Sequence, residues 1–289
     1  MSANADLHII ECPRDAMQGL EKFIPTEHKV AYLNTLLQVG FNTQDPGSLV
    51  SPKAIPQMRD SREVLEQLDY PSDLRRVLTI VANERGAREA AAIDPITHLG
   101  YPFSVSETFQ KRNTNKSIAE SQELVRRLLD IAQAAHKELV VYVSMGFGNP
   151  YREPWSGDIV LRFCEKLINM GVKTISLSDT IGTSNPASIS HLFETLIPAF
   201  PQTEFGAHLH TTQDSWFEKV DAAYKAGCRR FDGAIQGFGG CPMATDDLVG
   251  NMPTEMLVQY AVDQKIPLHI DQEAFREAYF HAQEVFPDH

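Results

Sequence analysis

The stretch Thr174–His210, TISLSDTIGTSNPASISHLFETLIPAFPQTEFGAHLH, contains one complete strand–helix–strand unit. It opens with a short β-rich run, Thr174–Ser178, and closes with a second, Glu204–His210. Between them, Asn185 is a helix-capping residue and Pro186 takes the first helical position, where a missing N–H costs nothing. The apolar residues of the helix recur at helical spacing: Ile189, Leu192, Phe193 and Leu196. The stretch therefore predicts two parallel strands joined by a covering helix.

The same unit recurs along the chain. The predicted strands are Leu7–Glu11, Phe41–Asp45, Val77–Val81, Thr97–Phe103, Leu139–Ser144, Thr174–Ser178, Glu204–His210 and Arg230–Ile235. Eight strand–helix units in succession close most simply as a TIM (β/α)8 barrel of the α/β class. An open doubly wound sheet is the alternative, but no GxGxxG motif follows the first strand, so a dinucleotide-binding fold loses its main support.

Capping residues mark the boundaries of the predicted helices. Thr26 is expected to cap a helix that stops at Gly40. Ser117 and Glu120 form a capping box at the start of another. From about Asp271 the pattern predicts one additional, C-terminal amphipathic helix, packed outside the barrel.

Composition narrows the class of protein. The chain has 289 residues, a length that α/β barrels reach as one domain, so residues 1–289 are expected to form a single catalytic domain. A net charge of −12 argues against nucleic-acid binding and against an anionic membrane surface. The first residues lack the pattern of a signal or transit peptide, and we expect a cytoplasmic protein. Its four cysteines are expected to be reduced thiols: Cys12, Cys164, Cys228 and Cys241.

Polar residues gather where the predicted strands end, which is where a TIM barrel builds its active site. His208 and His210 are alternate residues of one strand, so both imidazoles point to the same face. This pattern fits a metal site or two unrelated polar residues. Arg14 and Asp15 directly follow the first strand and fit a cation and a metal ligand, or a surface ion pair.

Two further candidates follow the eighth strand. The loop Gly237–Pro242 holds three glycines, which permit positive φ and a close approach to a ligand. Its thiol, Cys241, is open to the roles of nucleophile, general acid or inert small residue. Asn251 fits a metal ligand or a helix-capping amide. Together Asp15, His208, His210 and Asn251 offer two nitrogens and two oxygens, a set that suits Mg²⁺ or Mn²⁺ better than a closed zinc site.

Five segments then resemble the 3-hydroxy-3-methylglutaryl-CoA (HMG-CoA) lyases in order and spacing, from about residue 8 to 262. The segments are Glu11–Gln18 (ECPRDAMQ), Val50–Met58 (VSPKAIPQM), Ser178–Gly182 (SDTIG), His208–His210 (HLH) and Gly237–Pro242 (GFGGCP). The aspartate after the first strand and the HxH motif are also shared with isopropylmalate, homocitrate and citramalate synthases. This chain has Asp45 where the lyases carry a glutamate, and Thr211 where many relatives carry an acid after the HxH motif.

The resemblance implies a divalent-metal-dependent cleavage of HMG-CoA to acetyl-CoA and acetoacetate. It implies metal binding by Asp15, His208, His210 and Asn251. It further implies catalytic roles for Arg14, Asp45, Asp179, His208 and Cys241: charge stabilisation by Arg14, a thiol proton donor at Cys241, and an active-site acid at Asp179. His208 and Asp45 are the candidates for the general base.

The acyl-CoA substrate needs local positive charge despite the acidic surface. Besides Arg14, the candidates are Lys53 and a basic loop, Gln110–Ser117, with Lys111, Arg112 and Lys116. A solvated basic loop explains the latter group equally well. Homologous barrels often pair, and we expect a homodimer. Two other functions stay open: an acetyl-CoA-dependent condensing synthase of the same superfamily, and a non-catalytic relative that binds a metal or CoA.

Overall fold

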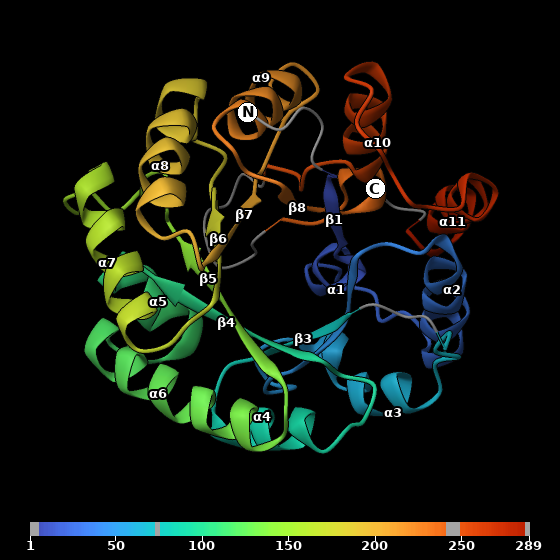
Figure 1. Cartoon of the computed structure of the whole chain (residues 1–289). Helices are drawn as coiled ribbons and strands as arrows, with labels where there is room; N and C mark the ends of the chain where they lie inside the picture. The colour runs from blue at the N-terminus through green and yellow to red at the C-terminus, as the bar shows by residue number, and fades with distance from the viewer. Residues whose placement is uncertain (1–5, 73–75, 241–248, 287–289) are drawn as a thin grey trace.

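The computed structural model describes residues 6–72, 76–240 and 249–286. Eight parallel strands, each hydrogen-bonded to the next and β8 to β1, close into a barrel surrounded by helices (Figure 1). The strands are β1 His8–Glu11, β2 Thr43–Leu49, β3 Val77–Val81, β4 His98–Ser104, β5 Glu138–Ser144, β6 Thr174–Ser178, β7 Glu204–His208 and β8 Arg230–Gly233. The predicted TIM barrel is confirmed.

Helices follow the strands along the chain, and most of them cover the outside of the barrel. They are α1 Pro13–Gln18, α2 Thr26–Val39, α3 Ser61–Glu66, α4 Glu84–Ala91, α5 Glu107–Thr114, α6 Ile118–Ala134, α7 Gly157–Asn169, α8 Pro186–Ala199, α9 Trp216–Lys225, α10 Thr254–Asp263 and α11 Gln272–Val285, with short 3₁₀ turns η1 Pro56–Met58 and η2 Ile235–Gly237. The two capping motifs predicted at Ser117 and Asn185 both form as capping boxes. No helix in the described ranges is long and apolar enough to cross a membrane.

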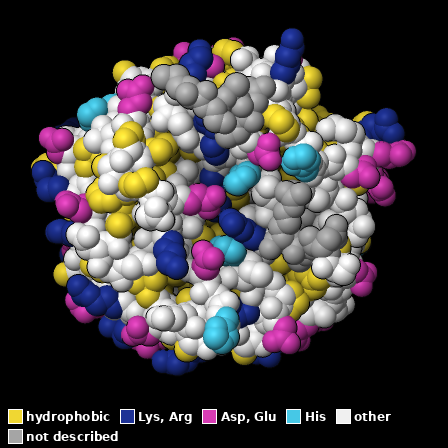
Figure 2. Space-filling model, in the orientation of Figure 1, with side chains coloured by type: hydrophobic (Ala, Val, Ile, Leu, Met, Phe, Trp, Pro, Cys, Tyr) yellow, Lys and Arg dark blue, Asp and Glu magenta, His cyan; other side chains and the backbone are white. Residues whose placement is uncertain are grey.

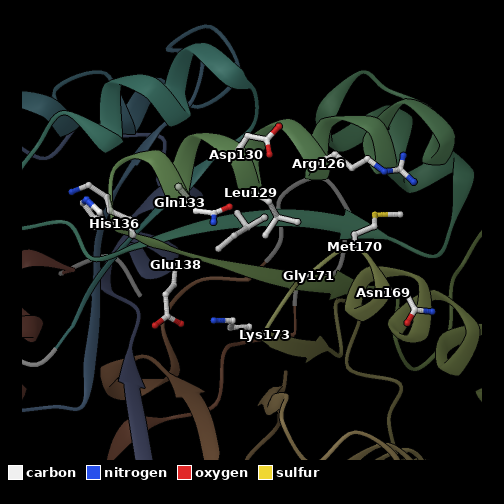
Figure 3. Close-up of a pocket in the computed structure, with 13 residues that line it drawn as sticks. Arg126, Leu129, Asp130, Gln133, His136, Glu138, Asn169, Met170, Gly171 and Lys173 are labelled. Carbon is white, nitrogen blue, oxygen red and sulfur yellow. The ribbon is translucent and has the colours of Figure 1, made fainter.

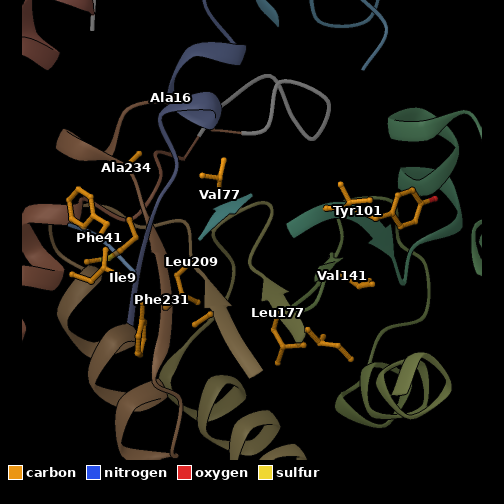
Figure 4. Packing of buried hydrophobic residues seen from close by; sticks show 14 of the residues in the cluster. Ile9, Ala16, Phe41, Val77, Tyr101, Val141, Leu177, Leu209, Phe231 and Ala234 are labelled. Carbon is orange, nitrogen blue, oxygen red and sulfur yellow. The ribbon is translucent and has the colours of Figure 1, made fainter. Parts of the chain in front are cut away.

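Alternation along the strands divides the interior into two apolar regions. Residues such as Val141, Leu177 and Phe231 point outward and join the large core between barrel and helices (Figure 4). Their neighbours point inward, where Leu78, Val140 and Tyr142 form a separate small cluster inside the barrel. The core that holds the fold together is therefore the shell between sheet and helices.

The C-terminal helix packs outside the barrel, as predicted, against α2 (Figure 1). The ring of Tyr32 on α2 meets His281 and Phe286 edge-on, with centroids 5.5 and 5.8 Å apart. Asp271 caps the helix by accepting hydrogen bonds from the backbone N–H groups of Glu273 and Ala274.

Several predicted boundaries differ from those of the structure. β2 runs from Thr43 to Leu49, later than the predicted Phe41–Asp45, and its register shifts between Gln44 and Gly47, around Pro46, which has no N–H for the ladder. The helix predicted to be capped by Thr26 is preceded by Pro25, and Thr26 is its first helical residue. β7 ends at His208 and β8 at Gly233, both short of the predicted ends.

The lumen of the barrel also contains buried charge. Arg230 and Asp232 point inward from β8 and are almost fully buried. At the N-terminal rim, Glu204 pairs with His8 and Arg76, each 3.5 Å away. In the space-filling view, basic, acidic and histidine side chains gather around the centre of one face of the barrel (Figure 2). Charged side chains of both signs therefore lie along the barrel axis, from the N-terminal rim to the opposite face.

Candidate active site

A cavity of about 380 Å³ opens at the C-terminal mouth of the barrel. Its lining residues come from α1, from the loops after β2 and β3, from α5, and from the ends of β5, β6 and β7. Those that the sequence had singled out are Arg14, Asp15, Arg112, Lys116, His208 and His210. Six candidates from distant segments therefore meet in one space, at the end of the barrel where TIM-barrel enzymes hold their active sites.

The short helix α1 sets Arg14 and Asp15 at the mouth. It begins immediately after β1 with Pro13 at its first position, so the chain turns sharply and both side chains are buried, 7% and 5% exposed. Burial opposes ionisation of Asp15, but the charges of Arg14 and His208 outweigh it and hold the pKa of Asp15 below its usual value. Asp15 is therefore a carboxylate in a dry, positively charged setting.

Arg14 is clamped to Asp45. Its Nε and Nη2 both donate to Oδ2 of Asp45, at 3.0 and 2.5 Å. Asp45 is fully buried, and burial raises its pKa to about 6 although Arg14 opposes the change. The other oxygen, Oδ1, has no hydrogen-bond partner among the described residues. Asp45 does not line the cavity itself, but it is hydrogen-bonded to Arg14, which does.

Both histidines of the HLH motif make their hydrogen bonds to other described residues through Nδ1 and not through Nε2. Nδ1 of His208 donates to Oδ2 of Asp232 at 3.1 Å, and Nδ1 of His210 donates to the carbonyl of Val249 at 2.9 Å. The ring centroids lie 5.4 Å apart, and Nε2 of His208 lies 3.5 Å from Oδ2 of Asp15.

The two imidazoles differ in electrostatic setting. Burial lowers the pKa of His208, but the hydrogen bond and charge of Asp232 raise it more, so the net change is upward. Burial and the neighbouring His208 lower the pKa of His210 to about 4. His210 is therefore a neutral imidazole near pH 7, the form that binds metal ions.

Asn251 reaches the same place from the segment before α10. It pairs with His210 through an isolated β-bridge, and its Nδ2 donates to the carbonyl of Phe238 at 2.8 Å. Its Oδ1 is buried with no partner among the described residues. Gly239, with φ of +93°, is packed between them: a Cβ there would lie 2.6 Å from the carbonyl oxygen of Asp15 and 2.8 Å from Nδ2 of Asn251. The glycine loop after β8 therefore lies directly against the Asp15–Asn251 side of the site.

The donor set fits a hard divalent cation. The two imidazoles and the carboxylate of Asp15 line one cavity, Asn251 with its orphaned amide oxygen lies beside Asp15 across Gly239, and Nδ1 of each imidazole is already held by an acceptor. Within the described ranges, no group of three or more histidine, cysteine or carboxylate side chains is spaced so that these residues alone could hold a metal ion.

Asp179 is buried beside His210 and is not among the residues that line the cavity. Both of its oxygens accept hydrogen bonds from Ser184, and Oδ2 also accepts from Nζ of Lys219 at 2.8 Å. Lys219, 3% exposed, in turn donates to the carbonyls of His210 and Gly182 at 2.9 and 3.0 Å. Through Lys219, Asp179 is linked to the backbone carbonyl of His210, and its role as an active-site acid stays a prediction.

Replacing Lys219 by methionine is expected to destabilise the fold by ~3–5 kcal/mol, because Asp179 is left as a buried unpaired charge. Denaturant unfolding of the purified chain measures this. The double variant Lys219→Met/Asp179→Asn removes both charges and should recover most of the loss. If Lys219→Met alone unfolds at the same denaturant concentration as the wild type, Lys219 and Asp179 are not a stabilising buried ion pair.

The basic candidates separate into two groups. Arg112 and Lys116 line the cavity, whereas Lys53 and Lys111 are exposed and do not. Lys111 is instead paired with Glu107, 3.1 Å away. The segment predicted to be a loop contains the end of α5, which begins at a capping serine, Ser106. Cys241 lies outside the described residues.

Sequence reasoning missed two residues of the site. Asp232 supports His208, and the sequence signal for it was a charged residue two positions after Arg230 in a predicted buried strand. Gln18 hydrogen-bonds Asp15 through Nε2 and accepts from Nη1 of Arg14 at 3.0 Å. Its spacing of four from Arg14 on a helix places it on the same face.

A larger cavity, about 850 Å³, opens at the opposite rim of the barrel. Its labelled residues come from α6, the start of β5, the end of α7 and the segment before β6 (Figure 3). The charges are mixed: Arg126, Lys137 and Lys173 stand with Asp130 and Glu138. Nζ of Lys137 already donates to two backbone carbonyls. Size alone therefore does not identify the functional cavity.

A closed parallel barrel with these side chains at its C-terminal mouth defines a TIM-barrel enzyme. The HMGL-like family model matches residues 8–279, and the chain belongs to this family.

Curated and solved relatives agree with the family. The chain is 34% identical to hydroxymethylglutaryl-CoA lyase YngG of Bacillus subtilis (strain 168) over 87% of its own length and 83% of that protein. It is similar in structure to the HMG-CoA lyase of Bacillus subtilis, with a TM-score of 0.91 and 31% identity over 98% of this chain and 95% of that one. It also resembles an HMG-CoA lyase from Acenitobacter baumannii in complex with coenzyme A and 3-methylmalate, with a TM-score of 0.90 and 30% identity over 99% and 93% of the two chains.

Proposed function

We propose that the chain is an HMG-CoA lyase that cleaves 3-hydroxy-3-methylglutaryl-CoA to acetyl-CoA and acetoacetate with the help of Mg²⁺ or Mn²⁺. The observation that carries the proposal is the meeting of the Arg14–Asp45 pair with Asp15 and His208 at one barrel mouth. Membership of the HMGL-like family and the names of the relatives support it.

Four residues would hold the cation: Asp15, His208, His210 and Asn251. The Nε2 atoms, which make no hydrogen bond to other described residues, and the orphaned Oδ1 of Asn251 support this set, and oxygen and nitrogen donors without thiolate favour Mg²⁺ or Mn²⁺. The bound cation supplies Lewis acidity, which lowers the pKa of a hydroxyl in contact with it.

The chain's own residues then carry the cleavage. The base that accepts the proton of the tertiary hydroxyl is His208, which lines the cavity, or Asp45, whose pKa is raised to about 6, through a water molecule. As the hydroxyl becomes a ketone, the C–C bond breaks, acetoacetate leaves and the electron pair remains as the enolate of acetyl-CoA. Arg14 stabilises the enolate oxygen, and its partner Asp45 keeps the guanidinium in place. The thiol of Cys241 delivers a proton to the enolate carbon, which completes acetyl-CoA.

The acyl-CoA would enter beside α5. Arg112 and Lys116 line the cavity and supply positive charge for a phosphate, and Arg112 also donates to the hydroxyl of Tyr151 at 3.3 Å. The coenzyme A in the Acenitobacter baumannii structure supports an acyl-CoA as the class of substrate.

The test is turnover by the purified chain. Incubation with HMG-CoA and Mg²⁺ or Mn²⁺ should release acetoacetate and acetyl-CoA in equal amounts, and a chelator should abolish the reaction. A parallel incubation with acetyl-CoA and a 2-oxo acid measures release of free thiol. Thiol release there, without cleavage of HMG-CoA, would replace the lyase with a condensing enzyme.

A further inference from the structure

Asp232 lies inside the barrel on β8, beside His208. Its side chain is fully buried, and Oδ2 accepts the Nδ1–H hydrogen bond of His208 at 3.1 Å. Its second oxygen, Oδ1, lies 3.8 Å from Nη2 of Arg230 and has no hydrogen-bond partner among the described residues. No step of the proposed cleavage uses this carboxylate.

The contact fixes the tautomer of the imidazole. A carboxylate only accepts hydrogen bonds, so the proton of His208 is held on Nδ1 and the lone pair remains on Nε2. Nε2 faces Oδ2 of Asp15 at 3.5 Å. Two acceptors that face each other repel unless a proton or a metal cation lies between them. The Asp232–His208 contact therefore prepares one side of a cation site.

The pair Arg230–Asp232 is built into the lumen. Arg230 lies across Gly206 of β7, where a Cβ would come within 2.9 Å of its side chain, so the glycine makes room for it. The guanidinium only donates, and its Nη2 is paired by charge with Oδ1 of Asp232 at 3.8 Å. Oδ2 is left for His208, and a weak contact from Ser176 at 3.5 Å reaches the same oxygen.

We propose that Asp232 is a positioning residue that holds His208 in the tautomer whose Nε2 is free for the divalent cation. The inference rests on the proposed metal-dependent lyase function. An acceptor behind a metal-binding imidazole aligns the ring and increases its basicity, and losing one typically weakens metal affinity about 10–100-fold.

The test is Asp232→Asn. The amide oxygen would stay with Arg230, so the amide N–H would donate to Nδ1 of His208 and move the ring proton to Nε2. The Kd of the metal-free chain for Mn²⁺, followed by the electron paramagnetic resonance of free Mn²⁺, is expected to rise about 10–100-fold. In the metal-free chain with isotope-labelled histidine, at a pH where the imidazole is neutral, the Nδ1–H signal of His208 is expected to disappear. His208→Gln identifies that signal.

Glu204→Gln is the matched control. It removes the same charge from the opposite end of the lumen, on the neighbouring strand β7, and should leave both readouts unchanged. If Asp232→Asn does not fold, the double variant Asp232→Ala/Arg230→Met removes both buried charges and is expected to show the same loss of Mn²⁺ affinity.

Wild-type Mn²⁺ affinity and a retained Nδ1–H signal in Asp232→Asn would overturn the inference. So would an equal loss of affinity in Glu204→Gln, because charge alone would then explain the effect. These readouts need no turnover. A wild-type chain that binds Mn²⁺ with the expected dependence on Asp232, yet cleaves no HMG-CoA, would support the inference and contradict the proposed function alone.

Discussion

Replacing Arg14 by glutamine is expected to lower kcat for HMG-CoA by on the order of 10²–10³-fold, the cost of removing one preorganised donor from a developing oxyanion. The guanidinium faces the cavity while two of its nitrogens hold Asp45. Glutamine lacks both the positive charge and the paired N–H donors of the guanidinium. The loss should fall mainly on kcat, because the enolate charge exists only as the reaction proceeds. Steady-state kinetics with circular dichroism as the folding check measures it.

The control for Arg14→Gln is Arg112→Gln, which also lines the cavity but lies on α5, away from Asp45. It is expected to raise KM with little change in kcat, because it would contact the CoA portion equally in the ground and transition states. Equal kcat values for Arg14→Gln and the wild type would exclude Arg14 from the chemistry.

Replacing Asp15 by asparagine is the second change with a large expected effect. The Kd for Mn²⁺ is expected to rise by on the order of 100-fold or more, since changes one shell further from a metal already cost about 10–100-fold. Activity at moderate Mn²⁺ should be lost in parallel. Asparagine keeps the shape of the side chain but lacks the negative charge. In the wild type, the charges of Arg14 and His208 keep the Asp15 carboxylate ionised.

Asp130→Asn, at the larger cavity on the far rim, is the matched control and should bind Mn²⁺ as the wild type does. Saturating Mn²⁺ is expected to restore part of the activity of Asp15→Asn. An unchanged Kd in Asp15→Asn would remove this aspartate from the cation site.

The barrel could be predicted because most strands carry their signal locally. The runs Val77–Val81 and Thr174–Ser178 were predicted with the bounds that the structure has. β2 was shifted because Asp45, Pro46 and Gly47 are residue types that strands disfavour, yet they are buried inside one. α5 was taken for a loop because few of its residues are apolar, and a capping serine holds its start.

The same distinction holds for the site: residues with a local sequence signal could be predicted, and contacts made only by tertiary packing could not. Asp15, His208 and His210 follow strand ends, and the register of a barrel brings strand ends together, so their meeting could be predicted. The surroundings of Asp179 could not. Its partner Lys219 lies 40 positions later in the sequence on α9, and only the packing of α9 brings the two charges together as a buried ion pair.

Counting the nitrogen ligands of bound Mn²⁺ by pulsed electron paramagnetic resonance tests the central claim most directly. We expect two directly coordinated imidazole nitrogens per bound ion in the wild type. Each of the variants His208→Ala and His210→Ala should lose one. An ion without imidazole nitrogen, or Mn²⁺ binding that survives the loss of both histidines unchanged, would contradict the account.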